Sequence, residues 1–289
     1  MGLGEVIYIN NGTSFVRNSI WGQEITSESK ISSALVDLDN DGDLDLNIMG
    51  LDSAKSYINN GTSFMYNAYW GTLTADEGSI VWGDIDNERD FDVIESRVSG
   101  SCGQGNKILI NNGSEFADNT PSWDLDMTGY QFGSLALGDY DNNGYLDLVS
   151  IGYCGGGNYA EILSNNGTTL SRDYTAESNI TGIYYSSALW GDVDNDNDLD
   201  LLIIRSQKVY INNITISNKA PTSPISFSTS YNNRMIKLVW QNGNDTETNT
   251  SGLYYNLMVG TSAQNHTIIS GIYGGQGDQT GGGTTGGYF

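Results

Sequence analysis

Several residue types are scarce in this chain of 289 residues, and each shortage argues against a class of function. Lys and Arg number 12 against 35 Asp and Glu, for a formal charge of −23, which argues against nucleic acid or an anionic membrane surface as a partner. With one His and two Cys, a zinc site of these ligands is not expected. A Ser-His-Asp or Cys-His catalytic device would depend on His266 alone.

Long apolar runs are also missing. No run approaches the roughly 20 residues that span a bilayer, so no membrane insertion is expected. The opening residues MGLGEVIYINNG hold no basic region followed by an apolar stretch, and so no secretory signal is visible.

What the chain does contain is a series of short apolar runs. The apolar fraction is 38%, too high for a disordered acidic tail, and there are 37 Gly but only 3 Pro. Asn, Asp, Gly, Ser and Thr crowd between the runs, which predicts an all-β protein of short strands joined by turns.

Two motifs recur along the chain. Four acidic segments begin VDLDNDGDLDL at Val36, GDIDNERDFDV at Gly83, GDYDNNGYLDL at Gly138 and GDVDNDNDLDL at Gly191, with 47, 55 and 53 residues between their first aspartates. The second motif alternates with these segments along the chain, and its five copies read YINNGTSF, YINNGTSF, LINNGSEF, LSNNGTTL and YINNITIS. Asn-Gly is a strong hairpin signal, and a unit of about 50 residues with three or four strands fits a β-propeller blade.

The acidic segments read as metal-binding loops of the pattern D-x-D-x-[DNE]-x-x-x-D. Three or four carboxylates within nine residues repel one another unless a cation lies among them, and Ca²⁺ takes six to eight oxygen ligands in flexible geometry. We expect ligands at positions 1, 3, 5 and 9, with a backbone carbonyl at position 7. In chain order these are Asp37, Asp39, Asp41, Asp43 and Asp45; Asp84, Asp86, Glu88, Asp90 and Asp92; Asp139, Asp141, Asn143, Tyr145 and Asp147; and Asp192, Asp194, Asp196, Asp198 and Asp200. The alternative is a set of solvated Asx turns.

The second loop is expected to bind least well. Gly42 and Gly144 supply the flexible residue after position 5, and Asn197 also tolerates a left-handed conformation, whereas Arg89 brings side-chain bulk and a positive charge. We therefore rank the first, third and fourth loops above the second.

These loops, each followed by an LDLV-type strand, resemble FG-GAP/VCBS repeats, the blades of integrin-alpha-like β-propellers. The resemblance covers residues 1–216. It implies a Ca²⁺-stabilised propeller, usually of seven blades, on secreted or cell-surface proteins that adhere or recognise ligands. The chain departs from it in having four acidic loops and in opening midway through a blade. Either upstream blades are missing, or the first strands complete the last blade and close a ring of about five.

The C-terminal part differs from the repeats. In residues 217–270, the runs APTSPISFSTSY, RMIKLVWQN and LYYNLMVGT predict three strands, with Trp240 in their core. They resemble the first half of a fibronectin-type-III-like sandwich, which needs about seven strands. Residues 271–289 form a Gly-rich tail, typical of a flexible linker. The sequence is either a partial sandwich that can accept a strand from a neighbour or a fragment of a longer product.

Modification and packing sites can also be assigned. Asn-x-Ser/Thr acceptors for N-glycans lie at Asn11, Asn60, Asn112, Asn166, Asn179, Asn213, Asn244, Asn249 and Asn265. Cys102 and Cys154 lie in similar loops of adjacent units and form either a disulfide, in an oxidising compartment, or two free thiols. The recurring Trp and Tyr residues are expected to fill contacts between units rather than to stack on sugars.

Three functions are compatible with this sequence. The first is a non-enzymatic, calcium-binding extracellular module for adhesion or ligand recognition, including lectin activity. The second is a glycosylated subunit of an extracellular filament or surface layer, joined head to tail to other copies through open strand edges. The third is a polysaccharide-active enzyme, which is disfavoured because the carboxylates are committed to the loops.

Overall fold

The computed structural model describes residues 7–22, 25, 32–49, 54–70, 79–96, 106–123, 127–214, 219–232, 235–248, 250, 253, 255 and 285–288. Within these residues the protein is built from small antiparallel sheets and has almost no helix, which confirms the all-β prediction. No helix in this part of the chain is long and apolar enough to cross a membrane.

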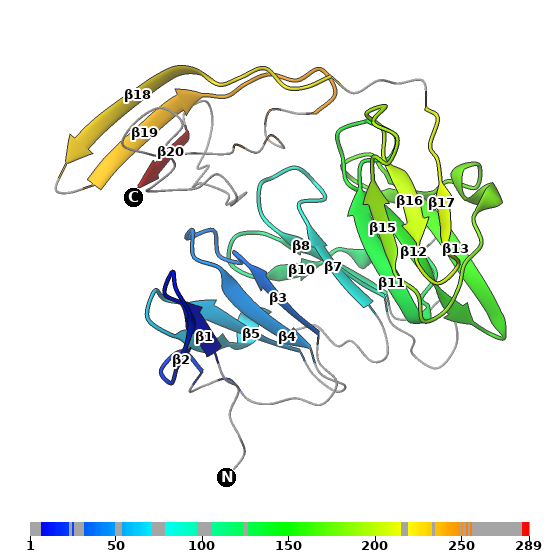
Figure 1. Ribbon diagram of the computed structural model, residues 1–289, viewed down its shortest axis with the longest axis horizontal. Helices are drawn as coiled ribbons and strands as arrows, with labels where there is room; N and C mark the ends of the chain where they lie inside the picture. Colours follow the sequence, from blue (N-terminus) through cyan, green and yellow to red (C-terminus); the bar gives the residue numbers. More distant parts are fainter. Residues whose placement is uncertain are drawn as a thin grey trace, which may run out of the picture.

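The repeats fold as consecutive antiparallel meanders (Figure 1). A hairpin comes first, and three four-stranded sheets and one three-stranded sheet follow it along the chain. In each sheet the strands are neighbours in chain order, and a short helical turn follows the fourth strand of each four-stranded sheet. The hairpin strands are β1 (Ile7–Asn10) and β2 (Phe15–Asn18). The four sheets are β3 (Ser32–Val36), β4 (Asp45–Met49), β5 (Ala54–Asn59) and β6 (Phe64–Asn67); β7 (Ser79–Gly83), β8 (Asp92–Ser96), β9 (Lys107–Asn111) and β10 (Phe116–Asp118); β11 (Gln131–Gly138), β12 (Asp147–Cys154), β13 (Gly157–Asn165) and β14 (Leu170–Arg172); and β15 (Ala188–Gly191), β16 (Asp200–Ile203) and β17 (Lys208–Tyr210). The helical turns are η1 (Ala68–Trp70), α1 (Thr120–Trp123) and η2 (Ala176–Asn179).

Apolar side chains join each sheet to the next. Strands β8 and β9 place alternate residues on opposite faces, so that Val93 and Leu109 pack toward the preceding sheet while Ile94 and Ile108 pack toward the following one. A third cluster joins the sheets β11–β14 and β15–β17, and a fourth joins the hairpin to the sheet β3–β6. Both faces of an inner strand are therefore covered, and all five residues of β8 are buried, the polar Asp92, Glu95 and Ser96 among them.

Aromatic residues fill these seams, as predicted. Trp21 lies edge-on against Phe64 with ring centroids 5.2 Å apart, and Trp70 lies edge-on against Phe116 at 4.9 Å. Trp123 belongs to the cluster between the second and third sheets. Among the described residues, no cluster joins the sheet β15–β17 back to the hairpin, so a closed propeller remains a prediction.

The C-terminal residues form a separate three-stranded antiparallel sheet, drawn across the top of Figure 1. Strands β18 (Ile225–Asn232) and β19 (Met235–Gln241) confirm two of the predicted strands, and Trp240 is buried as expected. The predicted third strand lies mostly outside the described residues. Strand β20 (Thr285–Tyr288) pairs with β19, so the expectation of a wholly flexible tail is wrong for these four residues, whose backbone groups satisfy the edge of β19.

Candidate metal centres

Each acidic loop joins the first two strands of a sheet at one fixed register. The pairs that close the loops are Val36↔Asp45, Gly83↔Asp92, Gly138↔Asp147 and Gly191↔Asp200. Eight residues lie between the two members of each pair, and this arrangement brings the first and last aspartates of every loop together at the same end of its sheet.

The aspartate at position 1 organises the turn. The Asp84 carboxylate accepts hydrogen bonds from the backbone N–H groups of Glu88 and Arg89, both at 2.9 Å. Asp139 does the same with Asn143 and Gly144, at 2.9 and 3.0 Å. These bonds curl the backbone around the carboxylate and hold the following ligands close to it.

Two residues of each loop adopt positive φ. The residue after position 5 does so at Gly42, Gly144 and Asn197, as predicted. Position 4 does so as well, with φ between 56° and 64° at Asn40, Asn87, Asn142 and Asn195. Position 4 was not singled out in the sequence, although it is Asn in all four loops, and Asn is one of the few side chains that tolerate this conformation.

The aspartate at position 9 is buried and forms two hydrogen bonds in every loop. In the third loop, Asp147 Oδ2 accepts from Tyr140 N at 3.0 Å and Asp147 Oδ1 accepts from Asn165 N at 2.7 Å. The other loops repeat both bonds with Asp45, Asp92 and Asp200. This residue therefore ties the loop to the third strand of its own sheet as well as facing the other carboxylates.

In each of the four loops the structure brings three of the predicted ligands together. In each, three carboxylates offer oxygen atoms that all lie within 4.8 Å of one another. The groups are Asp37, Asp39 and Asp41; Asp84, Asp86 and Asp92; Asp139, Asp141 and Asp147; and Asp192, Asp194 and Asp200. The first group lacks the predicted position-9 residue Asp45, and the second and fourth groups lack the predicted position-5 residues Glu88 and Asp196.

Unpartnered oxygens and raised pKa values indicate that these groups suit a cation. Asp37 Oδ1 and Asp39 Oδ1 are buried without a hydrogen-bond partner, as are side-chain oxygens of Asp90 and Asp198 at position 7. Burial, followed by repulsion from Asp86, raises the pKa of Asp92 to about 9. A buried carboxylate oxygen that accepts no hydrogen bond is costly, and a divalent ion would satisfy it.

The same two causes act on all four loops. Burial first, with repulsion from neighbouring carboxylates, raises the pKa of Asp45 to about 7 and that of Asp147 to about 8. In the fourth loop, burial first, then a side-chain hydrogen bond with Asp196 and repulsion from that carboxylate, raise the pKa of Asp198 to about 6. The residues present therefore fit Ca²⁺, which would be held by the carboxylates named above and would supply the missing positive charge.

The second loop folds like the others despite Arg89. This residue adopts φ of 78°, and its Nη2 donates to the Thr250 backbone carbonyl at 3.3 Å. The following loop also contacts this segment, because a Cβ atom on Gly144 would lie 2.4 Å from the Glu247 carbonyl. The backbone thus does not set the second loop apart, and its lower rank remains a prediction.

Neighbouring loops are joined by asparagine side chains. Asn111 Nδ2, in the second sheet, donates to the Leu38 carbonyl in the first loop at 3.0 Å. Asn165 Nδ2 reaches the Ile85 carbonyl in the second loop, and Asn212 Nδ2 the Tyr140 carbonyl in the third, each at 2.7 Å. Each of the first three loops is therefore completed by a residue of the next repeat.

The glycan acceptors fall into two groups. Asn11, Asn60, Asn112 and Asn166 occupy equivalent exposed turns, where each Oδ1 accepts hydrogen bonds from the hydroxyl and N–H of the residue two positions later. Asn179, Asn213 and Asn244 are exposed in other settings, and Asn249 and Asn265 lie outside the described residues. Occupancy remains a prediction.

One of the two cysteines can be placed. Cys154, at the end of β12, is buried and disulfide-bonded. Cys102 lies outside the described residues, so the predicted Cys102–Cys154 pair remains a prediction.

Comparison with known proteins identifies one repeat. A family model described as an FG-GAP-like repeat matches residues 139–203, which run from the third loop through the fourth to β16. This confirms the resemblance for that part of the chain. No curated protein is similar enough to count as a match.

Two solved structures are similar to parts of the chain. One is an Agrocybe aegerita lectin, described as recognising non-reducing terminal N-acetylglucosamine, with 18% identity, a TM-score of 0.46, and coverage of 68% of this chain and 54% of that one. The other is a Photorhabdus luminescens Tc holotoxin pore, with 16% identity, a TM-score of 0.34, and coverage of 59% of this chain and 8% of that one. The chain thus spans about half of the lectin and a small fraction of the toxin chain.

Proposed function

We propose that this protein is a calcium-binding β-repeat module of the propeller type, which acts outside the cell in adhesion or ligand recognition and carries no catalytic activity. The observation that carries the proposal is the group of three close carboxylates found in all four loops, each of which joins its strands at the same register. Asp and Asn oxygens at alternating positions, with buried carboxylates that need a cation, are the donor set of a Ca²⁺ site. The FG-GAP-like match over residues 139–203 supports the same assignment.

In this function calcium is structural. The loops lie where successive strands turn and where one repeat hydrogen-bonds to the next, so an ion in each loop would fix the relative position of two sheets. A rigid series of sheets can present recognition loops at defined spacings, which is what an adhesion or ligand-binding module requires.

Calcium titration tests the proposal. Isothermal titration of chelator-treated protein is expected to show up to four bound Ca²⁺, one for each carboxylate group. Asp39→Asn and Asp141→Asn are each expected to remove one ion, while Glu115→Gln, at an exposed site outside the loops, should leave the stoichiometry unchanged. Absence of binding in millimolar calcium would refute the calcium assignment.

A recognition assay tests the second half of the proposal. We expect the calcium-loaded protein to bind a subset of surfaces on a glycan and extracellular-protein array, and to lose that binding in chelator. Turnover of polysaccharides by the same preparation would instead support the enzyme interpretation.

Self-assembly is a second candidate, favoured by one observation. In the hairpin β1–β2, Phe15 is 71% exposed, although its counterpart Phe64 in the next repeat is 6% exposed. An uncovered strand pair of this kind can be covered by strands of another copy. Electron microscopy of the purified protein would show filaments or rings if it assembles, and separate monomers at every calcium concentration would count against assembly.

A further inference from the structure

The first three seams between consecutive sheets are built in the same way. A Trp that follows the last strand of one sheet packs on a large residue in the last strand of the next. Trp21 meets Phe64 and Trp70 meets Phe116, while Trp123 shares a cluster with Leu170. An aromatic ring is therefore the standard filler of a seam in this protein.

Among the described residues, the fourth seam, between the sheets β11–β14 and β15–β17, has no Trp at the position that Trp21, Trp70 and Trp123 take in the earlier seams. The backbone bond from Trp123 N to the Asn119 carbonyl, at 3.1 Å, is matched by the bond from Glu177 N to the Asp173 carbonyl, also at 3.1 Å. Glu177 therefore stands where Trp123 stands, and its carboxylate accepts from Arg172 Nε at 2.9 Å. In the repeated motif, the position of Phe64, Phe116 and Leu170 is taken by Ser217, which lies outside the described residues.

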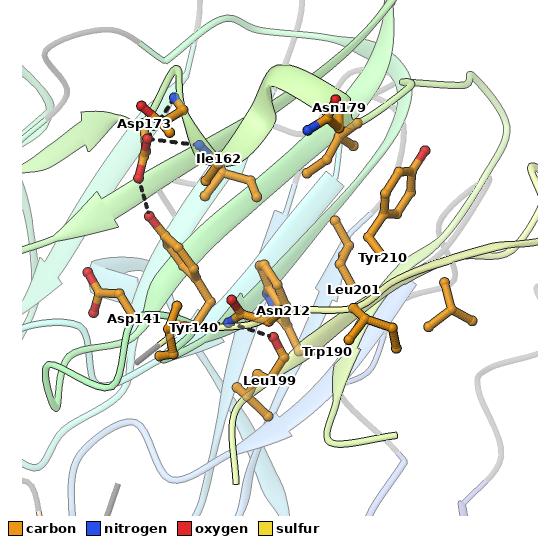
Figure 2. Close-up of a pocket in the computed structure, with 16 residues that line it drawn as sticks. Tyr140, Asp141, Ile162, Asp173, Asn179, Trp190, Leu199, Leu201, Tyr210 and Asn212 are labelled. Atoms are coloured by element: carbon orange, nitrogen blue, oxygen red, sulfur yellow. Dashed lines mark hydrogen bonds between the residues drawn. The ribbon is translucent and has the colours of Figure 1, made fainter. Parts of the chain in front are cut away.

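A cavity of about 630 Å³ occupies this seam (Figure 2). Apolar side chains from both sheets line it, among them Ile162, Leu201 and Tyr210. Tyr140 and Trp190 are stacked, with ring centroids 5.9 Å apart and an angle of 10° between the ring planes. The volume falls within the range of small-molecule sites, and apolar cavities of this kind bind aromatic compounds.

Charge restricts what can enter. Asp173, which belongs to none of the carboxylate groups of the metal centres, lines the cavity, and none of the described lining residues is Lys or Arg. The Asp173 carboxylate accepts hydrogen bonds from Tyr140 Oη at 2.8 Å and from two backbone N–H groups, which favours its charged form. The cavity therefore disfavours anions and accepts uncharged or cationic groups.

We propose that this cavity binds an uncharged or cationic aromatic ring, held between the two sheets as Trp70 and Trp123 are held in the earlier seams. The ring can belong to a free compound or to an aromatic side chain of a partner. This inference goes beyond the calcium role proposed above.

Ligand-observed NMR and calorimetry on the full chain in saturating calcium test the site. Indole and tryptamine should bind, whereas indole-3-acetate should bind at least about tenfold more weakly because of the Asp173 carboxylate. N-acetyl-tryptophanamide distinguishes the sources, because its binding with an affinity above that of indole would indicate a partner side chain. Stronger binding of methyl glucoside than of indole would overturn the proposal.

Variants that fill the cavity provide the structural control. Ala176 and Asn179 line the cavity, and Ala176→Phe and Asn179→Phe should each weaken indole binding by at least about tenfold. Ser178→Phe lies on the same helical turn but does not line the cavity, so it should bind like the unmodified protein. Unchanged binding in both filled variants would overturn the proposal.

A second measurement on the unmodified protein does not depend on how these variants fold. An azido-indole probe, activated by light and mapped by peptide mass spectrometry, should label segments 173–180 and 209–214, which line the cavity. Labelling confined to other segments would place the ring elsewhere and overturn the proposal. The same labelling is repeated in chelator, so that the absence of a ring site can be told apart from a failure of the loops to bind calcium.

Discussion

At the scale of single residues, asparagine does more in this protein than the repeated sequence suggests. Asn165 is fully buried, and its amide donates to the Ile85 carbonyl in one loop and to the Leu146 carbonyl in another, while its Oδ1 accepts from Gly167 N. The motif containing it predicted only a hairpin turn. In the pairs 111–112 and 165–166 the first Asn is buried and the second is exposed, and the buried one donates to the loop of the preceding repeat, a contact that a hairpin pattern does not reveal.

Removal of this side chain should therefore be costly. Asn165→Ala leaves two buried carbonyls without their donor, and we expect a loss of about 2–4 kcal/mol in the free energy of unfolding. Asn158→Ala, at an exposed position of the same strand, should change stability by less than about 0.5 kcal/mol. Urea denaturation of both variants in calcium measures the difference, and equal stabilities would contradict the role assigned to Asn165.

Two glycines separate backbone strain from steric contact. Gly42 and Gly144 have φ of 93° and 90°, but a Cβ atom on Gly42 meets nothing within 4 Å, whereas one on Gly144 would lie 2.4 Å from the Glu247 carbonyl. Gly42→Ala should cost about 1–2 kcal/mol from backbone strain alone. Gly144→Ala should cost clearly more, because segment 247–248 must move. Thermal denaturation measures the stability of both variants. A greater loss for Gly42→Ala than for Gly144→Ala would contradict the contact between Gly144 and segment 247–248.

At the scale of elements, the seams between sheets carry the packing. Trp70 is buried, stacks edge-on against Phe116 and receives a hydrogen bond at its backbone carbonyl from Ser56. Trp70→Ala should therefore lower the free energy of unfolding by about 3–5 kcal/mol. Leu189→Ala, at a half-exposed position of β15, should cost much less. Chemical denaturation followed by circular dichroism measures both, and a small effect at Trp70 would show that the seams are not the core.

Strands and loops of the repeats were predictable because the signals are local. Alternating residue types, Asn-Gly turns and recurring aspartates specify each sheet within about 50 residues, and the register at Asp92 or Asp147 follows from that pattern. The pairing of β20 with β19 was not predictable, because its residues TGGY carry no strand signal. The cavity beside Trp190 was also missed, since it arises from substitution of an aromatic residue by Glu177 in a seam that only the folded chain reveals.

At the scale of the whole molecule, the loops concentrate much of the charge. They hold 18 of the 35 acidic residues, and three carboxylates in each loop lie close to one another. Without a cation this arrangement opposes folding, and with one it favours folding. The stability of the entire series of sheets should therefore depend on both calcium and protons.

The pH dependence follows from the direction of the pKa changes. The pKa of Asp92 rises from 3.8 to about 9, that of Asp147 to about 8 and that of Asp45 to about 7, so the ion-free folded state binds protons more tightly than the unfolded state. This contribution is complete below pH 4 and is lost as the pH rises toward 9. In chelator, the melting temperature should therefore fall between pH 5 and pH 9.

Calcium should cancel this decline, because it replaces the protons on the same oxygens. Differential scanning calorimetry at pH 5, 7 and 9, with calcium or with chelator, measures the effect, and sodium chloride at matched ionic strength provides the control for simple screening. A melting temperature in chelator that stays constant or rises with pH would contradict the raised pKa values.

The asparagine that reaches from each repeat into the preceding loop also gives the molecule a direction. The Leu38, Ile85 and Tyr140 carbonyls obtain their donors from residues 73, 80 and 72 positions further along the chain. On a ribosome, each loop would emerge well before the side chain that completes it. Each of these loops would therefore be completed only after the next repeat had been synthesised. A nascent chain that stalls within the repeats would carry one loop whose carbonyl still lacks its asparagine donor.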